Sequence, residues 1–255
     1  RMALRLDDPK LARRIMDEVV RRFPGEPRVA LLRATQLQQA GQAEEARAIL
    51  AQVEPQAAVD PEMRAMLAIA YETVRDLEAA ARVMAQGPQD TSSYGVRASL
   101  LARAGDNRAL ATLYEELAED ATRPDPTRRL LLGRIAEFLE RPAEALDWYR
   151  GVAGGPHRTE ARMRAAVALH NLERRDEAYA EARALQDDAS VADEARREAY
   201  LLEAEMRQRE GDDAGELEVL GRGLAAWPDD PDLLYARGLA WERQDRIDRA
   251  EADLR

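Results

Sequence analysis

A spacing of small and large apolar residues recurs along the chain at intervals of about 34 residues. In the stretch Pro231–Leu254, the large, small, aromatic, small and large positions are held by Leu234, Gly238, Trp241, Ala250 and Leu254. The stretch before it starts near Arg197 and has Tyr200, Ala204, Gly211, Leu220 and Pro228 in the corresponding positions. Small residues on both helices of a pair allow close antiparallel packing, and their larger neighbours fill the groove beside them. Because one pair cannot bury its apolar face alone, this spacing predicts a stack of helix pairs.

The same spacing places seven repeats, starting near residues 27, 61, 91, 126, 159, 197 and 231. Helix-breaking prolines and glycines separate several of them, as at Gly87-Pro88 and Arg123-Pro124-Asp125-Pro126. No stretch alternates apolar and polar residues for long enough to indicate a strand. We therefore predict an all-α fold over residues 1–255. It is a single solenoid of about six complete helix pairs with a partial repeat at each end, wound into a right-handed superhelix.

Both ends of the chain fall inside repeats. Asp7–Arg22 is expected to be the second helix of a repeat whose first helix is absent, and the last helix runs to Arg255. We therefore expect a fragment of a longer protein, whose further repeats and any targeting segment lie outside this chain. The apolar residues expected to be exposed at the two ends are Leu4, Leu6, Ile247, Ala250 and Leu254.

Charge and composition argue against several classes of function. The formal net charge is −11, whereas a general nucleic-acid binder presents a clustered basic face. The chain has no cysteine, which excludes disulfides, thiolate metal ligands and thiol nucleophiles. No apolar run reaches the length of about 18 residues that a membrane span needs. Arginines alternate with acidic residues at helical spacing, which is typical of solvated ion-pair faces.

Groups that could carry catalysis are scarce. The chain has two histidines, His157 and His170, and its serines have no G-x-S-x-G context. No histidine, cysteine or acidic residues follow a zinc or calcium motif. Gly221-Arg222-Gly223 lacks the preceding strand and the third glycine of a dinucleotide site. We predict no catalytic residue, no metal and no cofactor.

The spacing in Pro231–Leu254 resembles the tetratricopeptide repeat (TPR) pattern W-x2-L-G-x2-Y…A-x3-F…P. One position departs from the pattern, because Arg237 stands where it has leucine. The resemblance implies a concave surface lined by the first helix of each repeat. Carried onto the central repeats, the concave positions are Ser92, Gly95, Ser99, Ala102, Arg103, Thr127, Leu130, Arg134, Glu137, Phe138, Glu160, Met163, Val167, His170 and Asn171.

Some of these positions form a predicted binding site for a protein or peptide partner. Its residues are Ser99, Arg103, Arg134, Phe138, His170 and Asn171. Small side chains leave room for a partner segment, while arginine and aromatic side chains are typical of residues that carry binding energy. In this hypothesis Arg103 and Arg134 meet partner carboxylates, and Phe138 meets an apolar side chain. The alternative is that both arginines only pair with nearby glutamates such as Glu137.

A narrower resemblance involves Leu233–Arg255 and the arginine-rich, lysine-poor style of the whole chain. Both look like bacterial outer-membrane TPR lipoproteins, some of which are adaptors that bind a periplasmic carboxyl-terminal-processing protease and present substrates to it. This implies a non-enzymatic scaffold or adaptor in the periplasm, associated with the outer membrane, with a cytoplasmic location as the alternative. Two other functions stay open. They are a scaffold of an exopolysaccharide secretion system and an interaction module of an enzyme whose catalytic domain lies outside this chain.

Overall fold

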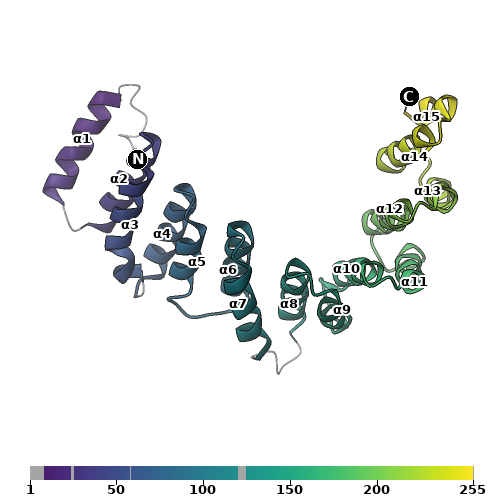
Figure 1. The fold of residues 1–255 in the computed structure, drawn as a ribbon, viewed down its shortest axis with the longest axis horizontal. Helices are drawn as coiled ribbons and strands as arrows, with labels where there is room; N and C mark the ends of the chain where they lie inside the picture. The colour runs from purple at the N-terminus through teal and green to yellow at the C-terminus, as the bar shows by residue number, and fades with distance from the viewer. Residues whose placement is uncertain (1–8, 24–25, 58, 120–124, 255) are drawn as a thin grey trace. The chain divides into compact units, whose positions relative to one another are not determined.

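The computed structural model describes residues 9–23, 26–57, 59–119 and 125–254. Within them the chain is all-α, with helices and no strands, which confirms the predicted fold class (Figure 1). The chain divides into two compact units, unit 1 (Arg1–Leu117) and unit 2 (Ala118–Arg255), and each is described by itself. The continuity of a single solenoid over residues 1–255 therefore stays a prediction.

Unit 1 consists of one helix followed by three helix pairs. The helices are α1 (Pro9–Arg22), α2 (Pro27–Gln39), α3 (Ala43–Ala57), α4 (Pro61–Thr73), α5 (Leu77–Met84), α6 (Thr91–Ala104) and α7 (Asn107–Glu119). Each of α2 to α5 packs against the helix that follows it, and α2 also contacts α4, the first helix of the next pair. The unit is therefore a stack of pairs in which the first helices α2 and α4 touch.

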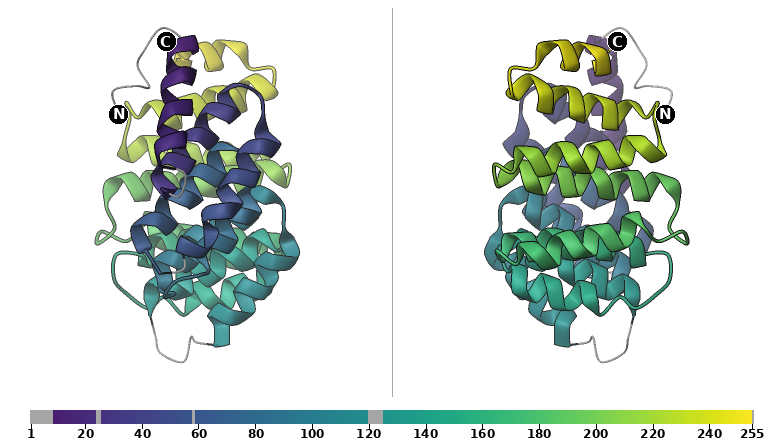
Figure 2. Two further views of the ribbon diagram at one scale, coloured as in Figure 1. Left: turned by 90° about the vertical axis from the view of Figure 1, so that its left-hand side faces the viewer. Right: turned by 90° about the vertical axis from the view of Figure 1, so that its right-hand side faces the viewer.

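Unit 2 contains four helix pairs. The helices are α8 (Pro126–Phe138), α9 (Pro142–Arg150), α10 (Arg158–Asn171), α11 (Arg175–Gln186), α12 (Asp193–Arg209), α13 (Asp213–Ala226), α14 (Pro231–Arg243) and α15 (Ile247–Leu254). In the right-hand view of Figure 2, its green to yellow helices lie side by side in a stack. The first helices touch in sequence, α8 to α10, α10 to α12 and α12 to α14. One surface of unit 2 is therefore built from first helices alone.

The helix starts follow local signals in the sequence. At Asp60, Asp125 and Asp230 a carboxylate caps the helix by accepting a backbone N–H bond, and a proline occupies the first helical position. Five of the seven predicted starts coincide with the first residue of a helix, and α10 starts one residue early. The start predicted near Arg197 is late, because α12 begins at Asp193, where two acidic residues favour a helix N-terminus.

Small residues bring the two helices of a pair together, as the spacing predicts. A Cβ added at Gly133 would lie 2.2 Å from the ring of Tyr149, and one added at Gly238 would lie 2.9 Å from Leu254. The turn inside every pair contains one residue with a left-handed backbone. These residues are Gly41, Arg75, Gly105, Glu140, Glu173, Gly211 and Asp245.

Two departures from the repeat pattern have a structural explanation. Arg237, which replaces the pattern's leucine, makes a two-pronged ion pair with Asp253 of α15 at 2.6 and 2.7 Å, so a charged contact joins this helix pair. Leu110, which stands where the repeat pattern has a small residue, is also accommodated, because its side chain is fully buried. Of the apolar residues expected at the ends, Ile247 and Leu254 are about half exposed and Ala250 is buried, while Leu4 and Leu6 lie outside the described residues.

Candidate functional site

A groove of about 560 Å³ opens on the surface formed by the first helices of unit 2. Its walls come from α8, α10 and α12. The lining residues are Glu137, Thr159, Glu160, Met163, Arg164, Val167, Ala195, Glu198, Leu201, Leu202 and Glu205. On α10 and α12 they recur every three or four positions, so each helix turns one continuous face to the groove.

The groove has an apolar centre. Met163 and Val167 of α10 face the groove together with Leu201 and Leu202 of α12, and all four side chains are partly buried. Apolar surface that is open to solvent in a concave site is available for an apolar side chain of a partner. This apolar centre is therefore the part of the groove best suited to bind a ligand.

Two carboxylates on one side of the groove are held by hydrogen bonds. Glu137 accepts from the Tyr149 hydroxyl at 2.7 Å and from Arg164 at 2.9 Å. Burial of the Tyr149 hydroxyl and the adjacent Glu137 carboxylate raise the pKa of Tyr149 far above its ordinary value, so this hydroxyl stays a donor.

Glu160 accepts from Arg164 at 2.9 Å and from Nε of Arg134 at 3.1 Å. Burial alone would raise the pKa of Glu160, but the hydrogen bonds and charges of Arg134 and Arg164 outweigh it and lower the pKa. Glu137 and Glu160 thus share Arg164, and both are satisfied within the protein.

The carboxylates of α12 are held less firmly. Glu205 pairs with Arg209 at 2.5 Å, but both side chains are more than half exposed, and such a pair contributes little stability. Glu198 is exposed and has no ion-pair or hydrogen-bond partner among the residues that the structure describes. Negative charge on this wall is therefore available to a ligand.

The site residues predicted in unit 1 lie on α6. Ser99 and Arg103 are exposed, and Arg103 donates to Glu72 of α4 at 2.7 Å. Ile69 of α4 and Val96 of α6 are among the large apolar side chains that are exposed in this unit. The arginine is thus engaged with the neighbouring repeat.

The predicted residues of unit 2 lie around the groove rather than in it. Arg134 reaches it through its bonds to Glu160, and Phe138, 47% exposed, ends α8. Nε2 of His170 is 3.2 Å from Glu210, and this side chain is almost buried, while Asn171 is exposed. The structure therefore shows Arg103 and Arg134 paired with glutamates, although these are Glu72 and Glu160 instead of the Glu137 named from the sequence.

Sequence reasoning found part of the groove and missed the rest. Four of the concave positions derived from the repeat pattern line it, namely Glu137, Glu160, Met163 and Val167. The contribution of α12 was missed, although the same positions of the repeat that starts near residue 197 are Glu198, Leu201 and Glu205. The repeat pattern therefore contains the signal for α12 as well as for the three central repeats.

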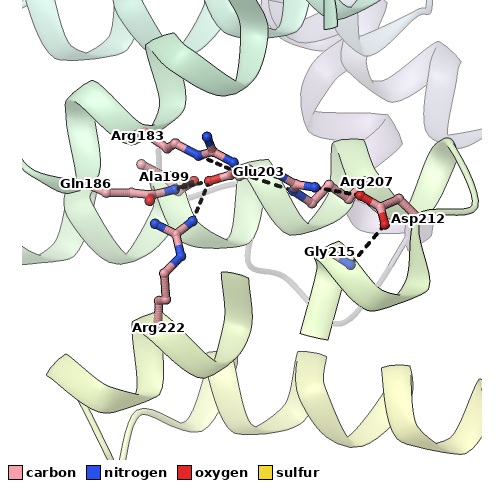
Figure 3. A network of polar contacts seen from close by, with 8 residues as sticks. All are labelled: Arg183, Gln186, Ala199, Glu203, Arg207, Asp212, Gly215 and Arg222. Atoms are coloured by element: carbon pink, nitrogen blue, oxygen red, sulfur yellow. Dashed lines mark hydrogen bonds and ion pairs between the residues drawn. The ribbon is translucent and has the colours of Figure 1, made fainter. Parts of the chain in front are cut away.

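A second polar cluster surrounds Glu203 of α12, which does not line the groove (Figure 3). Glu203 is fully buried and accepts from Arg183 of α11 at 3.1 Å, from Arg207 at 3.0 Å and from Arg222 of α13 at 3.1 Å. Gln186 adds a bond of 2.9 Å to the same carboxylate and also donates to the backbone carbonyl of Ala199. These bonds connect three successive helices, so the cluster is part of the packing of unit 2.

Other kinds of site find no support in the described residues. No group of three or more histidine or acidic side chains there is arranged so that it could hold a metal ion. Among the described helices, none combines the length and apolar composition that crossing a membrane requires.

Comparison with known proteins agrees with the repeat architecture. A tetratricopeptide repeat family model matches residues 3–70. A stretch of 127 residues, 49% of this chain, is 32% identical to a TPR repeat-containing protein of Pseudomonas aeruginosa, of which it covers only 20%.

A solved structure shows the same fold at low sequence identity. A tetratricopeptide repeat protein from Parabacteroides merdae superposes with a TM-score of 0.55 at 16% identity, over 78% of this chain and 77% of that one. BtubC from P. vanneervenii gives a TM-score of 0.47 at 18% identity, over 80% and 88% of the two chains. The family match over residues 3–70, the recurring small–large spacing and the stacked helix pairs identify a tetratricopeptide repeat architecture in this chain.

Proposed function

We propose that this chain is a non-enzymatic interaction module that binds a segment of a partner protein in the groove between α8, α10 and α12. The observation that carries the proposal is the open apolar centre formed by Met163, Val167, Leu201 and Leu202. In a repeat protein each helix pair contacts only its neighbours, and the extended surface of first helices is the one that can follow a partner chain. Binding at such a centre draws its free energy mainly from apolar burial.

The residues predicted from the sequence keep a place in this proposal as flanking contacts. Phe138 is exposed at the end of α8, and Asn171 is exposed at the end of α10. Ser99 and Arg103 belong to unit 1 and lie outside the groove, while Nε2 of His170 lies 3.2 Å from Glu210. Arg103 and Arg134 could contact a partner carboxylate only by sharing or leaving Glu72 and Glu160.

The specific role that we propose is that of an adaptor which presents substrates to a periplasmic carboxyl-terminal-processing protease at the outer membrane. Support comes from the resemblance of Leu233–Arg255 to adaptor lipoproteins and from the partial match to a bacterial TPR protein. Because that match covers a fifth of the relative, a secretion scaffold and a module of a larger enzyme are the alternatives. The full-length gene product distinguishes the three by what accompanies the repeats.

The groove itself can be tested without knowing the partner. A random peptide library displayed on phage is selected on the wild-type chain and, in parallel, on a Val167→Gln/Leu202→Gln variant. Glutamine keeps the helix propensity while removing the apolar surface. We expect peptides that bind the wild type and bind the variant at least tenfold more weakly, at equal helicity and melting temperature. Peptides that bind both proteins equally would place the interaction elsewhere and overturn the proposal.

A further inference from the structure

The groove carries more negative than positive charge. Its lining contains four glutamates and one arginine. Arg134 and Arg209 pair with two of these glutamates from outside the lining, which leaves Glu198 unmatched and Glu205 held only by an exposed pair. Ligand binding that removes water would therefore bring an uncompensated carboxylate into a less polar environment unless the ligand supplies a cation.

The two loosely held carboxylates lie on one face of α12. Glu198 and Glu205 are seven residues apart, which is about 10 Å along a helix axis. Leu201 and Leu202 lie between them on the same wall of the groove. An extended segment covers that distance in about three residues, and its side chains alternate between two faces. Two cations about four residues apart therefore share one face with the apolar side chain between them, and their flexible stems let the charged ends reach both carboxylates.

The arginines at the groove already pair with glutamates of the protein, so they are less available to an acidic ligand than Glu198 and Glu205 are to a basic one. Arg164 donates to both Glu137 and Glu160, and Arg134 donates to Glu160. An acidic segment would have to break these bonds and would also face Glu198 and Glu205, so like charges would oppose it. Nucleic acid is disfavoured for the same reason.

We infer that the occupant of the groove is a basic–apolar protein segment, in which two lysine or arginine side chains about 10 Å apart flank an apolar side chain. The cations meet Glu198 and Glu205, and the apolar side chain enters the centre between α10 and α12. This inference rests on the proposed function, because it specifies the chemistry of the segment that the groove binds.

The experiment extends the peptide selection with two charge variants. One is Glu198→Arg/Glu205→Arg, which reverses the charge of the groove wall. The other is Glu115→Arg/Glu218→Arg, which makes the same change in net charge at two exposed positions on second helices, outside the groove. Peptides enriched on the wild type are sequenced, and their affinities for all variants are measured by fluorescence polarisation at low and high ionic strength.

We expect the enriched peptides that depend on Val167 and Leu202 to be rich in lysine or arginine next to an apolar residue. They should bind the Glu198→Arg/Glu205→Arg protein at least about tenfold more weakly than the wild type. Their affinity for the Glu115→Arg/Glu218→Arg control should fall by less than about threefold. Their affinity for the wild type should also fall as the ionic strength rises. Groove-dependent peptides that are neutral or acidic, or that ignore the reversal at Glu198 and Glu205, would overturn the inference and leave the groove function intact. If all selected peptides bind the Val167→Gln/Leu202→Gln variant as tightly as the wild type, both the proposed function of the groove and this inference are overturned.

Discussion

The two sides of α12 use glutamate in opposite ways. On the side that faces α11 and α13, Glu203 is buried and accepts bonds from three arginines and Gln186. On the side that faces the groove, Glu198 is exposed without a described partner, and Glu205 has only an exposed one. Because successive residues of a helix differ by about 100° in direction, one short stretch supplies both surfaces.

The difference separates residues that hold the repeats together from residues that are free to bind. Bonds to Glu203 tie α11, α12 and α13 into one packed cluster, and its loss would leave several guanidinium groups without their shared acceptor. The carboxylate of Glu198 contributes to no such cluster. Stability and ligand binding should therefore respond to different glutamates of the same helix.

The largest effect on stability should come from Glu203→Gln, with Glu198→Gln as the matched control. Glutamine removes the buried charge and replaces one acceptor oxygen by an NH2 donor, so the three arginines lose part of their shared acceptor, although Arg183 and Arg222 are partly exposed and can be hydrated. We expect a loss of about 2–3 kcal/mol for Glu203→Gln, and a change within about 0.5 kcal/mol for the exposed control. Thermal and urea unfolding followed by circular dichroism measures both. Equal losses of unfolding free energy at Glu203 and Glu198 would contradict the distinction between a structural face and a binding face of α12.

A smaller effect is expected from Tyr149→Phe, which tests how firmly the inner side of the groove is held. The Tyr149 hydroxyl is buried and donates to Glu137 at 2.7 Å, but Glu137 keeps its bond to Arg164. The variant should lose about 1 kcal/mol of unfolding free energy. Tyr235→Phe, at a mostly exposed tyrosine of α14, is the control and should change nothing measurable. A Tyr149→Phe loss as large as that of Glu203→Gln would mean that the groove wall is as much a structural cluster as the opposite side.

The smallest effect concerns Glu160 and acid. Its pKa is lowered in the folded protein by Arg134 and Arg164, so its contribution to stability is present above the unfolded pKa of about 4.3 and is lost as the pH falls through the folded value. Wild type should melt above Glu160→Gln at neutral pH, and this difference should shrink towards zero as the solution is acidified. A difference at Glu160 that grows with acidity would contradict the ion-pair description.

Local signals explain why so much of the fold could be predicted. Proline after an aspartate cap fixed the starts of α4, α8 and α14, and small residues such as Gly133 and Gly238 marked where two helices touch. Both kinds of signal lie within one repeat, so no long-range information is needed. Groove positions on α10 followed from the same repeat pattern because one helix face carries them.

Pairing between repeats could not be predicted in the same way. Arg103 with Glu72 and Arg134 with Glu160 join residues 31 and 26 positions apart, and the partner depends on how successive first helices are offset in space. A sequence separation near one repeat length indicates that an arginine can pair with a glutamate of the neighbouring repeat. It does not predict which of several glutamates is the partner. The burial of Glu203 is harder to predict, because a glutamate in the middle of a helix is expected to be exposed. Only the folded structure brings the three arginines around it.

Methyl NMR of the protein's methionines tests the central claim most directly. Met163 lies in the groove, whereas Met206 is buried on α12 outside it, so one labelled sample contains both the reporter and its control. A basic–apolar peptide from the selection is titrated into the protein labelled with ¹³C at the methionine methyl groups. Our account predicts that the Met163 methyl resonance shifts with the binding isotherm while that of Met206 stays in place. Saturable binding that leaves Met163 unshifted, or that moves Met206 as much, would contradict it.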